Sequence, residues 1–243
     1  LIMLAVALLA RLIVLPMDPG DNFMIRAWEG EAANAGYNPY ALAPNDAKLD
    51  ALRAGEWEGL NEIGQTSQQS PLGLGVFRLI DTFSLNTSGA KLIFTLFDVG
   101  ICLLLWGRFG AKGAILYAWN PLAIYCSAGA GIFEAVALMP IVAGFWIWDT
   151  WVDRKGGVVV INANGGINGG LGQMVCFAAF LIGLGAAFNF LFTPILLWQL
   201  WHTARKAGVS AGFWVFLVGL APLGFTLLWL EMSWGITWQN LGA

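Results

Sequence analysis

The chain has 243 residues, of which 58% are hydrophobic and 11% charged, and its net charge is −3. A soluble domain carries about 25% charged residues, so a chain this apolar cannot cover a water-exposed surface and is expected to have lipid as its main solvent. The negative charge and the lack of a basic stripe argue against nucleic acid as a partner. The three cysteines lie inside apolar runs without metal-ligand spacing, and no metal or cofactor is expected.

Long apolar runs divide the chain, and a membrane-spanning helix needs about 20 mostly apolar residues. Residues 1–17 are the first expected span, and the run 171–201 is long enough for two short spans that meet near Asn189 and Pro194. The other expected spans are 89–107, 112–129, 132–151 and 211–232, which gives seven crossings in all. Both ends look cut, so residues 1–243 are expected to form a single membrane domain from a longer protein.

A polar segment, residues 18–88, separates the first two spans and carries ten acidic residues against four basic ones. Apolar residues at helical spacing predict an amphipathic helix over 21–35, which a glycine ends. Asn38-Pro39-Tyr40 predicts a turn, and residues 46–54 predict a short helix. Residues 71–84 have one apolar face and are expected to lie in the membrane interface.

Basic residues in short loops mark the cytoplasmic side of a membrane protein. Arg108, Arg154 and Arg205 lie in three such loops, and the predicted crossings allow all three on the same side. The same count puts the acidic segment 18–88 on the outside. The Gly/Asn-rich stretch 156–170 is then expected to be an inside loop.

Several sequence pieces follow one another in a recognisable order. They are Trp28-Glu29-Gly30, Gly36-Tyr37-Asn38-Pro39-Tyr40 and Tyr117-Ala118-Trp119-Asn120-Pro121-Leu122. Over residues 1–150 the chain resembles the bacterial polytopic glycosyltransferases of the GT-C type, the mannosyltransferase-like group that uses polyprenyl-phosphate sugars. The resemblance implies an all-α polytopic membrane helix bundle in the bacterial inner membrane, with amphipathic interfacial helices in a large first external loop.

The resemblance also implies where the chemistry lies. Transfer of a sugar from a lipid phosphate needs an external carboxylate as base and donor groups near the phosphate. Asp21 and Glu134 are the candidate catalytic residues, and the candidate substrate-binding residues are Arg26, Asn38 and Tyr40. Structural alternatives stand beside them: a helix cap for Asp21, an interaction with the helix dipole for Glu134 and a surface salt bridge for Arg26.

The chain departs from the family pattern at several charged positions. Asn22 stands where an aspartate is expected, Ile132 where a histidine is expected, and Asn189 where an in-membrane lysine is expected. Because the scaffold pieces remain, we predict a catalytically degenerate member that acts as a structural subunit among other membrane proteins and lipid. The alternative is an active glycosyltransferase that moves a sugar from a lipid-linked donor at the outer membrane face.

Two further residues have no assigned role in the expected site. Asp98 lies inside an apolar run, where function and structural hydrogen bonding are equal alternatives. The only histidine, His202, is expected in solvent in a basic loop. If the chain is a structural subunit, an external docking surface is expected to contain Trp28, Tyr37, Tyr40 and Trp57.

Overall fold

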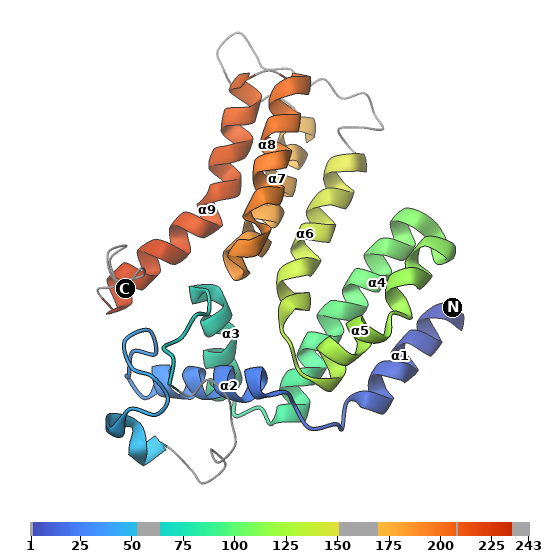
Figure 1. Cartoon of the computed structure of the whole chain (residues 1–243). Helices are drawn as coiled ribbons and strands as arrows, with labels where there is room; N and C mark the ends of the chain where they lie inside the picture. The colour runs from blue at the N-terminus through green and yellow to red at the C-terminus, as the bar shows by residue number, and fades with distance from the viewer. Residues whose placement is uncertain (1, 53–63, 151–169, 208, 235–243) are drawn as a thin grey trace. The chain divides into compact units, whose positions relative to one another are not determined.

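The computed structural model describes residues 2–52, 64–150, 170–207 and 209–234, and all regular structure in these ranges is helical (Figure 1). Two helices are long and apolar enough to cross a membrane, Thr87–Ala118 and Gly212–Trp229, and three shorter ones are apolar: Ile2–Val14, Glu134–Trp148 and Gly172–Phe188. The all-α prediction is confirmed for the described ranges, and the apolar helices support a membrane protein. The polytopic bundle with seven crossings stays a prediction. The loop predicted at 156–170 lies outside the described residues except for Gly170.

The chain divides into two compact units, which we describe separately. The first contains residues 1–99 and 115–135, and the second contains residues 100–114 and 136–243. The first unit holds α1 (Ile2–Val14), α2 (Asp21–Asn34), α3 (Pro71–Thr82), α5 (Pro121–Ile124) and both ends of α4 (Thr87–Ala118).

The helices of the acidic segment agree closely with the local sequence signals. α2 ends before Gly36, whose φ of 90° is a left-handed conformation that suits glycine. α3 begins after Ser70, whose hydroxyl accepts a hydrogen bond of 3.1 Å from the Gly73 N–H. The short helix predicted over 46–54 is a 3₁₀ helix at Ala47–Leu52, and residues 53 and 54 lie outside the described ranges.

α2 and α3 pack with their backbones close together. A Cβ atom added to Gly30 would lie 2.6 Å from the carbonyl carbon of Phe77, so only glycine fits this crossing. Four aromatic rings make edge-to-face contacts beside it, at centroid distances from 5.8 to 6.3 Å: Phe23, Phe77, Phe94 and Phe133. These rings form the core beneath α2.

Trp28 belongs to a second cluster of the first unit. Its side chain is 5% exposed and packs with Ala32 and Leu49. The prediction that Trp28 contacts a neighbouring chain or lipid is therefore wrong, because the indole fills the interior of its own unit. Trp57, which was expected on the same surface, lies outside the described residues.

α4 reverses its direction at Gly110. The backbone there has φ 69° and ψ −178°, which are not helical values. The Tyr117 hydroxyl donates a hydrogen bond of 2.6 Å to Asp98, 19 residues away, whereas a straight helix would separate these residues by about 28 Å. The basic loop predicted between 107 and 112 is thus a helix reversal.

The continuous helix predicted over 112–129 is wrong. α4 ends at Ala118, and the Asn120 side chain accepts a hydrogen bond of 2.9 Å from the Leu122 N–H to start α5. A π-helical turn over Tyr125–Gly129 follows α5. Proline has no N–H to continue the incoming helix and asparagine caps the next one, so Asn-Pro starts a new element here.

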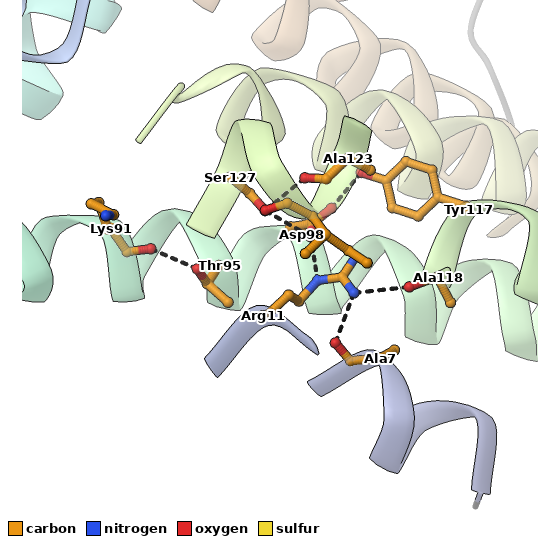
Figure 2. Close-up of polar contacts among 10 residues, drawn as sticks. Ala7, Arg11, Lys91, Thr95, Asp98, Tyr117, Ala118, Ala123 and Ser127 are labelled. Atoms are coloured by element: carbon orange, nitrogen blue, oxygen red, sulfur yellow. Dashed lines mark hydrogen bonds and ion pairs between the residues drawn. The ribbon is translucent and has the colours of Figure 1, made fainter. Parts of the chain in front are cut away.

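A buried ion pair joins α1 to α4 inside the first unit (Figure 2). The Arg11 Nε donates to Asp98 Oδ2 at 2.5 Å, and the two side chains are 0% and 1% exposed. The Asp98 carboxylate also accepts hydrogen bonds from the hydroxyls of Tyr117, at 2.6 Å, and Ser127, at 2.9 Å. Asp98 therefore has a structural role, which was one of the two alternatives at this position.

The second unit contains most of α6 (Glu134–Trp148), with α7 (Gly170–Phe188), α8 (Thr193–Ala207) and α9 (Val209–Trp234). α7 and α9 cross closely, since a Cβ added to Gly183 would lie 1.8 Å from the Gly219 carbonyl oxygen. Small residues at such crossings are typical of helix packing in membranes. The predicted break near Asn189 is confirmed: α7 ends at Phe188, and the Asn189 side chain caps the short helix that follows.

His202 lies on α8 and packs against two indole rings that also contact each other. Its ring centroid is 4.9 Å from that of Trp148 and 5.2 Å from that of Trp198, with which it stacks. The expectation that this histidine lies in solvent is therefore wrong. The basic residues near it in the sequence gave no sign of the aromatic neighbours that helix packing provides.

Candidate functional site

The first turn of α2 opens onto a hollow of about 370 Å³, which we call the Asp21 hollow. Its α2 side is formed by Gly20, Asp21, Asn22 and Ile25, and its other side by Tyr125, Ala130 and Ile132. The Gly20 N–H donates a hydrogen bond of 3.0 Å to the Ala130 carbonyl, which holds the two sides together. Gly20 is the cap residue of α2, so Asp21 is not the N-cap but an exposed carboxylate of the first turn.

Arg26 and Glu134, from α2 and the start of α6, lie close together beside this hollow. Arg26 Nη1 is 3.7 Å from Glu134 Oε1, and the two side chains are 27% and 40% exposed. The guanidinium also lies 4.8 Å from the centroid of the Phe133 ring. The structure therefore brings together a predicted phosphate-binding cation and a predicted catalytic acid through a long contact.

A second hollow of about 200 Å³ adjoins the first, because Asn22 and Ile25 line both. We call it the Glu29 hollow, and its other walls are Arg26, Glu29, Gln65, Thr66, Gln68 and Gln69. Glu29 is 4% exposed, and its Oε2 accepts hydrogen bonds from the Ser67 hydroxyl, at 2.9 Å, and from the Gln69 amide. Burial raises the pKa of Glu29, while the bonds from Gln69 and Ser67 and the charge of Arg26 oppose that rise.

Glu29 was absent from the candidate site residues derived from the sequence. The available signal was its place as the acid of Trp28-Glu29-Gly30, between a buried tryptophan and the glycine that packs on α3. Those two neighbours fix the face of α2 on which Glu29 lies. Its partners Ser67 and Gln69 lie 38 and 40 residues after Glu29, so no local pattern connects them to it.

Asn38 and Tyr40 lie in a turn that supports the second hollow without lining either one. The Asn38 side chain accepts a hydrogen bond of 2.9 Å from the Tyr40 N–H, and the Tyr40 hydroxyl donates one of 3.1 Å to the Gln69 carbonyl. Burial raises the pKa of Tyr40, and the negative charge of Glu29 adds to the rise, so this hydroxyl stays protonated as a donor. The turn holds the 65–69 segment against α2, and direct substrate contact by either residue stays a prediction.

Two of the positions that depart from the family pattern lie at these hollows. Asn22 lines both, and Ile132 lines the Asp21 hollow. In the described ranges, no group of three or more His, Cys, Asp or Glu side chains could hold a metal ion. The described polar residues at the two hollows can accept a proton, bind hydroxyls and, through Arg26, offer a cation.

No protein-family model, no curated protein and no solved structure matches the chain. The resemblance to the GT-C glycosyltransferases therefore stays a prediction from the sequence pieces named above.

Proposed function

We propose that the chain is a GT-C-like glycosyltransferase that moves a sugar from a polyprenyl-phosphate donor at the outer face of the bacterial inner membrane. One observation carries this proposal: an exposed carboxylate, Asp21, lines a hollow of about 370 Å³ that has both polar and apolar walls. The Ile25, Tyr125 and Ile132 side chains suit the lipid part of a donor, and Asp21 and Asn22 suit its polar head.

The reaction assigns one role to each group. Asp21 takes the proton of the acceptor hydroxyl while the oxygen of that hydroxyl bonds to C1 of the sugar. The bond between C1 and the phosphate oxygen breaks in the same step. Polyprenyl phosphate leaves with that electron pair. We assign the phosphate to Arg26, which lines the adjoining Glu29 hollow. Its 3.7 Å contact with Glu134 is longer than the roughly 2.7–2.9 Å of a charge-assisted hydrogen bond, so this pair can be exchanged for a phosphate.

The proposal is tested with the protein in liposomes that contain polyprenyl-phosphate donors with different radiolabelled sugars. Asp21→Asn is expected to lower transfer by about 10²–10⁴-fold, the usual contribution of a general base. Asp18→Asn is the matched control, because Asp18 is exposed, lies three residues away and lines neither hollow. Equal loss in both variants, or no loss in either, would contradict the role of Asp21.

A structural subunit of a larger membrane complex is the second candidate. The observation that favours it is Ile132, which lines the Asp21 hollow at the position where the family resemblance leads us to expect a histidine. A proton-handling group would then be missing from the site. Purification in mild detergent should give a complex of fixed stoichiometry if this candidate is right, and a lone protein with bound lipid phosphate if the enzyme is right.

A further inference from the structure

The Glu29 hollow has a composition that differs from that of the Asp21 hollow. Among the described residues that line it are three glutamines and one asparagine, which carry primary amides, and Ile25 is the only aliphatic one of this set. An amide presents a donor and an acceptor side by side, which matches two neighbouring hydroxyl groups. A peptide ligand would need apolar pockets for its side chains, and the described walls offer none.

The charges of the described residues that line the hollow nearly cancel. Arg26 contributes one positive charge and Glu29 one negative charge, and Arg26 also pairs with Glu134 outside the hollow. A phosphate or carboxylate ligand would lie against the Glu29 carboxylate. The electrostatics therefore favour a neutral ligand that is rich in hydroxyl groups.

The Glu29 carboxylate in this hollow is preorganised by hydrogen bonds within the protein. The Ser67 hydroxyl and the Gln69 amide both donate to Glu29 Oε2, so the carboxylate is held in one orientation. The amide nitrogen of Gln69 must face this carboxylate, because its oxygen would be repelled. Gln69 is 9% exposed, and its side-chain oxygen, Oε1, is buried without a hydrogen-bond partner in the described part of the chain.

A buried acceptor without a partner costs about 1–3 kcal/mol, so it is a place where a ligand hydroxyl or a water can bond. The volume of about 200 Å³ equals roughly seven water molecules at 30 Å³ each. This space is large enough for one sugar ring.

We infer that the Glu29 hollow binds one neutral sugar residue of the acceptor, with Glu29 and Gln69 as the residues that select its hydroxyl pattern. This inference rests on the proposed function for the identity of the acceptor, since the adjoining Asp21 hollow would then hold the donor. Glu29 is a specificity residue here and takes no proton in the reaction. A site that hydrogen-bonds substrate hydroxyls rejects analogues that lack them strongly, because its own polar groups are left unpaired.

The test is direct binding, which does not depend on turnover. Saturation-transfer NMR on the protein in nanodiscs uses neutral methyl glycosides of mannose, glucose and galactose, with glucose 6-phosphate and glucuronic acid as charged probes. At least one neutral glycoside should bind, and Glu29→Gln should weaken it about tenfold or more, as expected for loss of a hydrogen bond to a charged group. Glu31→Gln on the exposed side of α2 is the matched control and should bind like the unchanged protein.

A second variant covers the case in which Glu29→Gln does not fold. Gln68 is an exposed wall residue, so Gln68→Ala should leave the fold intact and still weaken glycoside binding. Binding of only the charged probes, or of no glycoside, overturns the inference. Glycoside binding without sugar transfer from any donor overturns the enzyme and keeps the sugar site, whereas Asp21-dependent transfer without glycoside binding overturns the sugar site alone.

Discussion

Removal of the Asp98 carboxylate should be among the most destabilising single changes in the first unit. In Asp98→Ala, the Arg11 guanidinium loses its carboxylate partner but keeps its bonds from Nη1 to the carbonyls of Ala7 and Ala118, both at 2.9 Å, at a site where its side chain is 0% exposed. Breaking a buried ion pair by removing one partner costs about 3–5 kcal/mol, because the remaining charge is left uncompensated. We expect a loss of unfolding free energy in that range.

The measurement is an SDS titration of the protein in dodecylmaltoside micelles, followed by tryptophan fluorescence. Asp149→Ala is the matched control, since Arg108 Nε donates to Asp149 at a similar 2.5 Å but the two side chains are 19% and 28% exposed. A pair that water reaches contributes about 1 kcal/mol or less, so the control should lose much less stability.

A double variant separates the charge from the packing. Arg11→Met with Asp98→Leu removes both charges and replaces them with apolar side chains, which are often neutral or stabilising in place of a buried pair. The double variant should therefore be more stable than Asp98→Ala alone. The reasoning is refuted if Asp98→Ala costs no more than Asp149→Ala, or if the double variant is the least stable of all.

Three other predictions follow from the first unit and the expected topology. Gly30→Ala should destabilise the protein by about 1–3 kcal/mol in the same titration, because its Cβ meets the backbone of α3, whereas Gly75→Ala, with nothing within 4 Å, should be neutral or slightly stabilising. Burial raises the pKa of Glu29 above its usual 4.5, so the folded state binds the proton more tightly than the unfolded state does. The free energy of unfolding should therefore fall as the pH rises from 4.5 through the raised pKa. Glu29→Gln should remove this pH dependence, and an unchanged dependence in the variant would contradict the assignment to Glu29. Cysteines placed at Asn45 and at Ala163, in a background without native cysteines, should label from opposite sides of the membrane, and same-side labelling would overturn the charge argument for orientation.

The elements that the sequence predicted well are those with local signals. The amphipathic helix ended by Gly36 and the break at Asn189 depend on residues within a few positions of each boundary. The helix predicted over 112–129 failed for a related reason: hydropathy alone covered Asn120, whose side chain caps a new helix. A polar residue directly before proline indicates the end of a helix. This signal was stronger than the signal for one continuous helix from the apolar residues on either side.

Only the site residues on α2 that the family resemblance indicates could be predicted from the sequence. Asp21 and Arg26 both lie on α2, and the family resemblance pointed to both, although a spacing of five residues does not place them on one face of the helix. Glu29 required the 65–69 segment, and the burial of Trp28 required Leu49 from the 3₁₀ helix. Such long-range contacts leave no periodic trace in the sequence. The aromatic residues were therefore expected on the surface, although Trp28 completes the core.

The Arg11–Asp98 pair has a consequence for how the protein is made. The two residues are 87 positions apart, so a ribosome that adds about 5–20 residues per second reaches the aspartate roughly 4–17 s after the arginine. During this interval Arg11, in the last turn of α1, lacks the carboxylate with which it pairs in the folded unit. In the proposed topology α1 is a membrane helix, and its stable integration is then expected to wait for α4. Truncated nascent chains that end before Asp98 should remain extractable by alkali, whereas chains that include α4 should resist extraction.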